Sequence, residues 1–505
     1  MQIAERRFIE MAFDYEYSPS CDRGSCSTII VGKAASATGH VLVAHNEDDY
    51  DCVIQVHKVP RIRHQAGETI RFADAKAVIP QVEETYAYQW SDFRCEGGIS
   101  FADCFVNEWG VAVVSNSCRP CKLGEEQPAD MGIGYGLRRL VAERARSARE
   151  AVEIAATLIE EYGYISSRTY QFCDKDEAWI FQVPTGHRYV AKRIPDDHVY
   201  MIPNHFTIHD VNFSDAGHKN YYFSADLVDY AMKNGWYQPA VPGDFSDFDF
   251  ARVYQDGPDK MHNLIRARQT WPMLLGERPE EWRPFSHKAP RKYSVAELRQ
   301  ILSSHFNGTE DDYNNGYERN PHVDRDPCPL CNTMTAESSV IEFAEEPALT
   351  CIWRAAPKPC ISPFVPWYVG AKRAPKGYQW LPVTVSQATH FAPGVEELHI
   401  DVSKAFWAFR VLQYFTEFDY KDTHEVIRKS VDELEAAWDA EQPLLREKCR
   451  SLLAEAPELA EELLSSYTEA QAQKAWDWAW KMVEQLGEDR IMKNSSTRVL
   501  PPENV

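Results

Sequence analysis

The sequence predicts an α+β layered fold with a helical segment at its C-terminal end. Short runs rich in β-branched residues stand before and after one long amphipathic stretch, an order of strands, helix and strands rather than a βαβ alternation. From about Ser403 onward the apolar pattern becomes helical. The chain has 505 residues, of which 44% are hydrophobic and 14 are tryptophan, so it can bury a sizeable core and is not predominantly disordered.

The first predicted strands form a β-hairpin with a cysteine at its leading edge. The run Cys26–Gly32 is rich in β-branched residues, a turn follows at 37–40, and a second strand covers Val41–Ala44. The stretch Ser18–Ser25 that precedes Cys26 is rich in turn-forming residues and should be accessible. We therefore expect residues 1–25 to be a leader rather than the start of a domain.

The later elements continue the layered pattern. A period of 3.6 residues predicts one helix over Tyr135–Tyr162, with Arg and Glu on its outer face. A last helix is predicted to begin at Thr468, where the spacing fits a capping box, and to end near Gly487 with its apolar stripe on the core. Further strands are predicted at Phe105–Val106, Val111–Val114, Thr169–Phe172, Ala178–Phe181, Val199–Ile202, Val340–Phe343 and Thr350–Trp353.

These elements divide the chain into four parts. We expect a leader at 1–25, a layered domain at 26–400, a helical segment packed on that domain at 401–492, and a flexible tail at 493–505. Residues 235–330 are rich in Pro, Asp and aromatic residues and show no clear period. No internal repeat or low-complexity tract divides the chain further.

The charge and the cysteines restrict the partners and the compartment. The chain carries 54 Lys and Arg against 76 Asp and Glu, a formal net charge of −22, which argues against binding to nucleic acid or to an anionic membrane. The sequence contains neither a secretory signal nor a run of the ~20 apolar residues that span a bilayer. Its 13 cysteines show no regular spacing, so we expect mostly reduced thiols in a cytoplasmic protein.

Cys26 is placed where an N-terminal nucleophile would stand. If the bond between Ser25 and Cys26 is cleaved, Cys26 carries both a thiol and a free α-amine. The unperturbed pKa of such an amine is ~7.7–8.0, so it can act as the base for its own side chain. The alternative is that Cys26 is a buried small apolar residue, as most free cysteines are.

Neither a metal nor a cofactor is expected from the spacing of the ligand-type residues. The two CxxC pairs, Cys118 with Cys121 and Cys328 with Cys331, stand far apart and lack a zinc-knuckle context. His305 and the other histidines show no metal-ligand spacing, and the Walker, GxGxxG and HExxH motifs are missing from the sequence.

The segments Cys26–Ala34 and Ala44–Asp48 resemble the opening of the dipeptidase A family of N-terminal-nucleophile (Ntn) cysteine peptidases, which is related to secernins and to bile-salt and penicillin-V hydrolases. The likeness continues at Asn107–Ala112, Asp176–Phe181 and Pro203–Ile208, and is scattered over nearly all of 26–490. The resemblance implies a four-layer αββα Ntn-hydrolase sandwich with a C-terminal helical segment.

The resemblance also assigns roles to particular residues. Cys26 would be the nucleophile, and Asp48 would be the carboxylate that holds the N-terminal residue. Asn116 would contribute to the oxyanion hole, and Asn204 would donate to or position the substrate. His45 stands where related hydrolases often carry Arg, so a substrate-binding group there would depend on pH.

The function implied by the resemblance is a cysteine-dependent dipeptidase that acts on dipeptides after removal of the leader, either by self-cleavage or by another agent. Two alternatives remain open. One is an Ntn amidase that cleaves N-acyl amides, and the other is a non-catalytic secernin-like protein that keeps its leader and binds partners. A homo-oligomer is compatible with each of them.

Overall fold

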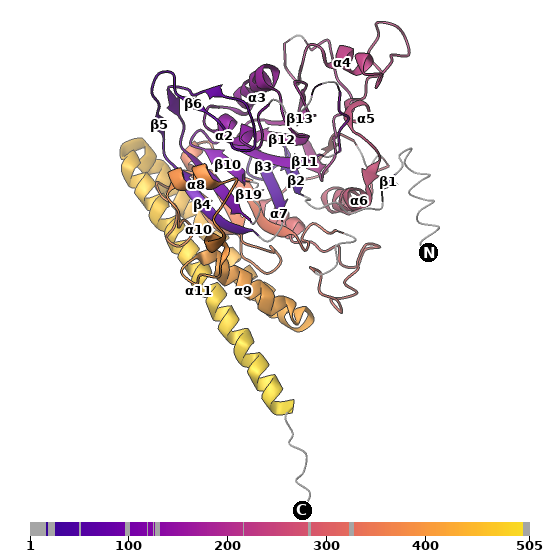
Figure 1. Cartoon of the computed structure of the whole chain (residues 1–505). Helices are drawn as coiled ribbons and strands as arrows, with labels where there is room; N and C mark the ends of the chain where they lie inside the picture. The colour runs from indigo at the N-terminus through magenta and orange to yellow at the C-terminus, as the bar shows by residue number, and fades with distance from the viewer. Residues whose placement is uncertain are drawn as a thin grey trace, which may run out of the picture.

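The computed structural model describes residues 17–18, 26–49, 52–95, 102–118, 120–124, 126, 132–215, 217–280, 284–322 and 328–497. It contains both helices and strands, and most of its strands belong to two large antiparallel sheets (Figure 1). The predicted leader, apart from residues 17–18, and the end of the predicted tail at 498–505 lie outside the described residues.

An eight-stranded sheet has the strand order β16-β14-β13-β12-β11-β10-β9-β4. Its strands are β4 (Val53–Val59), β9 (Tyr88–Arg94), β10 (Ala102–Asn107), β11 (Ala112–Ser117), β12 (Arg168–Cys173), β13 (Ala178–Val183), β14 (Val190–Arg193) and β16 (Tyr221–Phe223). All of its strand pairs are antiparallel.

A seven-stranded sheet has the order β18-β15-β2-β3-β19-β20-β21. Its strands are β2 (Ser27–Val31), β3 (Leu42–Asp48), β15 (His198–Ile202), β18 (His287–Lys288), β19 (Thr335–Glu342), β20 (Cys351–Ala355) and β21 (Val365–Tyr368). Three short pairs lie outside the large sheets: β1 (Tyr17–Ser18) with β17 (Asp259–Lys260), β5 (Ile62–Arg63) with β8 (Glu84–Thr85), and β6 (Thr69–Ile70) with β7 (Ile79–Pro80).

Side chains alternate between two apolar clusters along the strands of the eight-stranded sheet. On β11, Ala112 and Val114 belong to a large cluster that also contains Ile30 of β2, whereas Val113 belongs to a second cluster with Leu140. This period of two residues is the signature of a strand buried on both faces. One face of this sheet therefore meets the seven-stranded sheet, and the other face meets helices.

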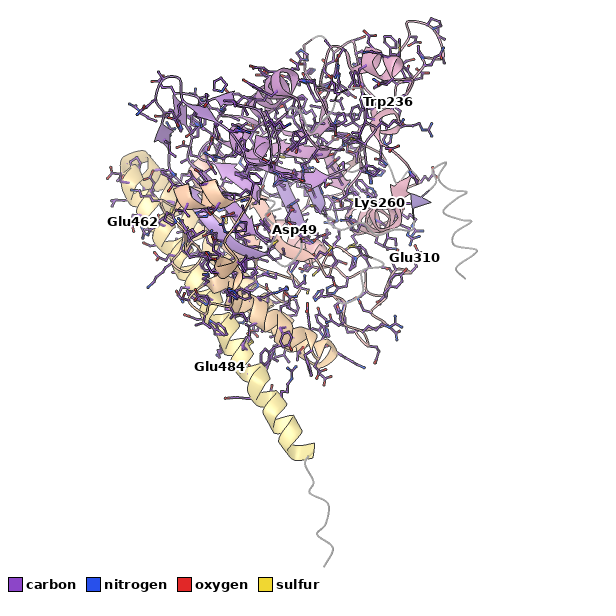
Figure 2. The ribbon with its side chains drawn as sticks, in the orientation of Figure 1. Asp49, Trp236, Lys260, Glu310, Glu462 and Glu484 are labelled. Carbon is purple, nitrogen blue, oxygen red and sulfur yellow. The ribbon has the colours of Figure 1, made fainter. Side chains whose placement is uncertain are left out.

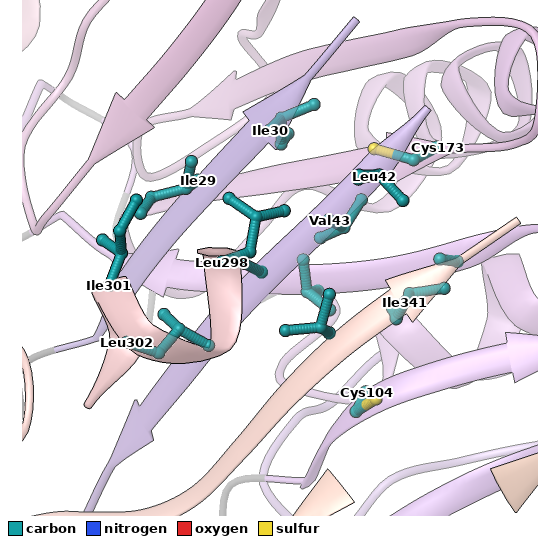
Figure 3. Packing of buried hydrophobic residues seen from close by; sticks show 14 of the residues in the cluster. Ile29, Ile30, Leu42, Val43, Cys104, Cys173, Leu298, Ile301, Leu302 and Ile341 are labelled. Carbon is teal, nitrogen blue, oxygen red and sulfur yellow. The ribbon is translucent and has the colours of Figure 1, made fainter. Parts of the chain in front are cut away.

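Helices pack on the outer face of each large sheet. Helices α2 (Leu137–Ala142) and α3 (Ala148–Tyr162) contact β10 to β13, whereas α6 (Met261–Leu275) and α7 (Val295–Leu302) contact β15, β3 and β19. Figure 3 shows Leu298, Ile301 and Leu302 on the side of α7 that faces β2 and β3. Shorter helices are α4 (Leu227–Lys233), α5 (Phe250–Tyr254), α8 (Val383–Thr389), η2 (Pro347–Leu349) and η3 (Val395–Leu398).

Most predicted elements are confirmed, but the single helix over 135–162 is wrong. The hairpin is present as β2 paired with β3, and every later predicted strand is found within one to a few residues of its expected limits. The predicted helix is split because Asn107 Nδ2 donates to the carbonyl oxygens of Ala142 (2.9 Å) and Ala145 (2.7 Å). The second helix then begins at a new N-cap, where Ser147 Oγ accepts from the backbone N–H of Glu150 at 3.1 Å.

The C-terminal part is helical as predicted, with α9 (Ala405–Glu417), α10 (Tyr420–Glu455) and α11 (Pro457–Thr497). Both predicted limits of the last helix, Thr468 and a point near Gly487, are wrong, because α11 begins at Pro457, a residue suited to the first turn of a helix, and continues to Thr497. Thr468 lies buried within α11, and its Oγ1 accepts from the backbone N–H of Tyr368 at 3.3 Å.

Helix α11 packs on the body along part of its length. Its small side chains Ala472, Ala475 and Ala479 are fully buried, which confirms the predicted packing stripe. Figure 2 shows Glu462 on the part of α11 that lies beside the sheets and Glu484 on the part that extends past them. Among the described helices, none is both long enough and apolar enough to cross a membrane.

Candidate active site

The backbone of Cys26 is held from both sides immediately before β2. Its N–H donates to Asn204 Oδ1 at 3.0 Å, and its carbonyl oxygen accepts from the guanidinium of Arg266 at 2.7 Å. Only 4% of the Cys26 surface is exposed. The position of this residue is therefore set by hydrogen bonds from two segments that are remote in the sequence.

Arg266 is the centre of this arrangement. It lies on α6, it is fully buried, and it donates to Ser27 Oγ (2.9 Å), Asn204 Oδ1 (2.8 Å) and Asn263 Oδ1 (2.8 Å). Asn204 in turn donates through Nδ2 to the carbonyl oxygen of Ser117 at 2.9 Å, on β11 of the other large sheet. The rigid fork of a guanidinium suits it to fix several acceptors at once.

The thiol of Cys26 contacts a carboxylate. Its Sγ lies 3.7 Å from Glu47 Oε1, and Glu47 Oε2 lies 2.9 Å from His45 Nε2. Both Glu47 and His45 are almost fully buried. The sequence-predicted residue His45 is therefore connected to the thiol through Glu47.

The same network continues from His45 to Asn116. His45 Nδ1 lies 2.8 Å from Thr28 Oγ1, which donates to Asn116 Oδ1 at 2.6 Å. Because the Thr28 hydroxyl has one proton and gives it to Asn116, His45 Nδ1 must carry the proton between His45 and Thr28. The contact between His45 Nε2 and Glu47 then holds one further proton, shared by an imidazole and a carboxylate.

Asn116 is itself fixed by several partners. Its Oδ1 also accepts from Gln171 Nε2 at 3.0 Å, and its Nδ2 donates to the carbonyl oxygen of Ile202 at 3.5 Å. The side chain is fully buried between the two large sheets. Its role as an oxyanion-hole donor stays a prediction.

Strand alternation separates Asp48 from Glu47. Thr28 pairs with His45 across β2 and β3, and Thr28 reaches toward β11, so His45 and Glu47 face the eight-stranded sheet. Asp48 points to the other face of β3, where its carboxylate accepts from Asn332 Nδ2 and Thr335 Oγ1, each at 2.7 Å. The role of Asp48 as the carboxylate that holds the N-terminal residue also stays a prediction.

A buried positive charge lies near Cys26. Burial alone would lower the pKa of Arg168, but the phenol groups of Tyr164, Tyr135 and Tyr170 and the Cys26 thiol raise it above its usual value. Arg168 also donates to Ser115 Oγ at 3.1 Å. This guanidinium therefore stays charged, and it interacts electrostatically with the Cys26 side chain.

Sequence reasoning missed Glu47, Arg168 and Arg266. The hairpin register could have found Glu47, because pairing Thr28 with His45 places position 47 opposite position 26. Nothing local could have found Arg266, since its partners depend on how α6 packs beside β15.

The sequence matches peptidase family C69 over residues 25–433. A probable dipeptidase from Latilactobacillus sakei is 26% identical over 413 residues, which cover 78% of this chain and 82% of that protein. A probable dipeptidase B from Lactococcus lactis subsp. lactis is 29% identical over 309 residues, covering 57% of this chain and 62% of that protein, which is less than two thirds of its length.

A solved structure is also similar, although weakly. A mutant of the conjugated bile acid hydrolase from Clostridium perfringens matches with a TM-score of 0.31 and 11% identity, covering 65% of this chain and 88% of that one. The family match covers most of the chain and includes Cys26, and on that ground the chain belongs to peptidase family C69, a family of enzymes that hydrolyse peptide bonds.

Proposed function

We propose that this chain is a cysteine-dependent dipeptidase whose nucleophile is Cys26, exposed by removal of residues 1–25. The observation that carries the proposal is the pair of contacts at Cys26, whose backbone N–H donates to Asn204 Oδ1 at 3.0 Å while its thiol lies 3.7 Å from Glu47. The names of the relatives from Latilactobacillus sakei and Lactococcus lactis support dipeptides as the substrate class.

Cleavage of the bond between Ser25 and Cys26 would turn the Cys26 backbone nitrogen into an amine. Asn204 Oδ1 can accept one of its protons and so orient its lone pair toward the neighbouring thiol. The amine takes the thiol proton, and the thiolate attacks the carbonyl carbon of the substrate. A C–S bond forms while the carbonyl electron pair moves to oxygen, which gives a tetrahedral oxyanion.

Collapse of the oxyanion breaks the substrate C–N bond. The ammonium of Cys26 gives its proton to the departing nitrogen, which leaves a thioester on the enzyme. The amine then takes a proton from water, and the hydroxide attacks the thioester. The C–S bond breaks, the acid product leaves, and the proton returns to sulfur.

The surrounding residues have distinct parts in this proposal. Arg266 positions Cys26 by binding its carbonyl oxygen at 2.7 Å, and Arg168 supplies positive charge close to the thiolate. Glu47 faces the thiol through Oε1 and shares a proton with His45 through Oε2. Asn116 is kept as the proposed oxyanion donor and Asp48 as a proposed partner of the amine.

We also propose that the body is the four-layer αββα sandwich of Ntn hydrolases. Supporting this, α2 and α3 pack on one large sheet, α6 and α7 pack on the other, and β11 contacts β2 between them. The proposed limits are 26–400 for this domain and 401–492 for the helices packed on it. A cytoplasmic location remains part of the proposal, and it is supported by the irregular spacing of the 13 cysteines in the sequence.

The test is the activity of Cys26→Ala on unblocked dipeptides, with Cys449→Ala as the matched control. Cys449 is a buried thiol within α10, away from β2, and its loss should leave activity unchanged. Loss of the nucleophile should lower kcat/KM by at least about 10³-fold. Full activity of the Cys26 variant would overturn the proposal, and faster hydrolysis of N-acyl amides than of dipeptides would make the enzyme an amidase.

A further inference from the structure

Four side chains with metal-binding atoms converge in the interior, in a region separate from the contacts around Cys26. They are His305, which follows α7, His322, Cys331, which precedes β19, and Cys360, which follows β20. All four are buried, and their ligand-type atoms lie within 4.8 Å of one another.

Four of the six distances among these ligand atoms lie close to the edges of a tetrahedron, and the remaining two are within 4.8 Å. The Nε2 atoms of His305 and His322 are 3.1 Å apart, and the two sulfur atoms are 3.5 Å apart. His322 Nε2 lies 3.5 Å from Cys331 Sγ and 3.4 Å from Cys360 Sγ. Zinc bonds of standard length in tetrahedral geometry would give edges of about 3.3 Å for N–N, about 3.8 Å for S–S and about 3.5 Å for N–S.

We propose that His305, His322, Cys331 and Cys360 form a structural zinc site. Two thiolates and two imidazoles complete a tetrahedral shell, so no coordination position is left for water or substrate. The site is therefore structural rather than catalytic, and it is independent of the chemistry at Cys26.

The outer nitrogen atoms of both imidazoles are already occupied, as in known metal sites. His322 Nδ1 lies 2.8 Å from the carboxylate of Glu417, at the end of α9, and His305 Nδ1 lies 3.2 Å from the hydroxyl of Tyr317. A carboxylate accepts the Nδ1 proton and leaves the Nε2 lone pair free for a metal. The Nε2 atom of His322 lies within 3.5 Å of both sulfur atoms.

A disulfide is a poorer account of the same cluster. The two sulfur atoms are 3.5 Å apart, whereas a disulfide bond is about 2.05 Å long. A disulfide would also leave the histidine Nε2 atoms facing each other at 3.1 Å without a common partner. A metal ion satisfies all four atoms together.

The four residues of the cluster lie on two segments of the chain that a metal would link. Residues 303–334 connect α7 to β19 and carry no helix or strand in their described part, which is unusual for so long a connection. The zinc would tie this connection to the segment after β20. The same connection supplies Leu330 and Asn332, which bind Asn46 and Asp48 of β3, the strand that also carries Glu47.

The test is the metal content of the full-length protein by plasma mass spectrometry, after expression in zinc-containing medium. We expect about one zinc per chain, and a cobalt-exchanged sample should show the visible absorption of tetrahedral thiolate-bound Co²⁺. Cys331→Ser and Cys360→Ser should each lose most of the metal. The matched control is Cys328→Ser, which changes the neighbouring cysteine of the same CxxC pair and should keep it.

Folded wild-type protein that holds less than a tenth of an equivalent of zinc after incubation with zinc would overturn the proposal, and this result does not depend on the folding of any variant. A non-reduced intact mass lower by two hydrogens, with Cys331 linked to Cys360, would also overturn it. Cys26→Ala should bind zinc as the wild type does, so failure of the proposed peptidase mechanism and failure of the zinc site can be told apart.

Discussion

Glu47 and Asp48 are adjacent acidic residues on β3, and the pleat of the strand gives them different surroundings. Glu47 contacts the Cys26 thiol and His45, whereas Asp48 accepts from Asn332 and Thr335 on the opposite face. If the carboxylate next to the thiol governs reactivity, Glu47 is the more important of the two.

Glu47→Gln should therefore lower kcat/KM on dipeptides by about 10²-fold, because it removes the carboxylate that shares a proton with His45 and contacts the Cys26 thiol. Asp48→Asn should cost less than about tenfold in kcat/KM and should mainly lower the midpoint of urea unfolding, since it weakens two buried hydrogen bonds. Steady-state kinetics and unfolding curves of both variants check this. If Asp48→Asn lowered kcat/KM more than Glu47→Gln does, Asp48 rather than Glu47 would be the carboxylate that matters more for catalysis.

Local sequence could indicate only part of this site. Cys26 stands out at the start of a β-branched run, and Asn204 follows β15, the strand that pairs with β2. Arg266 and Arg168 could not be found in this way, because they approach Cys26 only after α6 and β12 have packed into place. A guanidinium on a helix looks like any other solvated charge until its buried partners are known.

At the level of secondary-structure elements, a hydrogen bond of Lys58 joins a strand of the eight-stranded sheet to the segment that follows a strand of the seven-stranded sheet. It lies on β4 and donates to the carbonyl oxygen of Val369, just after β21, at 2.6 Å. Burial lowers the pKa of Lys58 to about 8. The charged form is therefore disfavoured in the folded protein, although this hydrogen bond needs only an N–H donor.

The lowered pKa of Lys58 determines how the free energy of unfolding changes with pH. Below pH 8 Lys58 is charged in both states and the full cost of burying the charge is present. Between about pH 8 and the unfolded pKa of ~10.4, the unfolded chain keeps a proton that the folded chain has lost, so stability rises with pH.

Relative to Lys58→Met, the free energy of unfolding of the wild type should therefore rise by up to ~2.4 kcal/mol between pH 7.5 and pH 10. Urea unfolding of both proteins at the two pH values measures the difference, and the variant cancels the other groups that titrate in this range. If the free energies of unfolding of the wild type and Lys58→Met differ by the same amount at both pH values, the pKa of Lys58 is not lowered by folding.

Helices and strands could be predicted from the sequence where a regular spacing of apolar residues defines them. Their first and last residues were harder to predict where tertiary contacts determine them. The strands of the hairpin and the later apolar runs are set by β-branched residues buried on both faces. The break between α2 and α3 depends on Asn107 of β10, which is remote from the helix in sequence. The early start of α11 follows from Pro457, whereas the capping-box spacing at Thr468 occurs within a helix that simply continues.

At the scale of the whole molecule, two large sheets carry helices on their outer faces, and residues that meet at each cluster come from distant segments. The set His305, His322, Cys331 and Cys360 has no zinc-finger spacing, which is why the sequence predicts no metal there. The contacts of Cys26 similarly join β2 to a loop after β15 and to α6. Folding, rather than local spacing, assembles both clusters.

The proposed mechanism requires Cys26 to be the N-terminal residue of the active enzyme. The intact mass and N-terminal sequence of purified wild-type protein test this requirement when they are measured on the same sample whose dipeptidase activity is assayed. We expect the active protein to begin at Cys26, with a free α-amine beside the thiol. Full activity from a chain that still begins at Met1 would show that Cys26 does not act through a free α-amine.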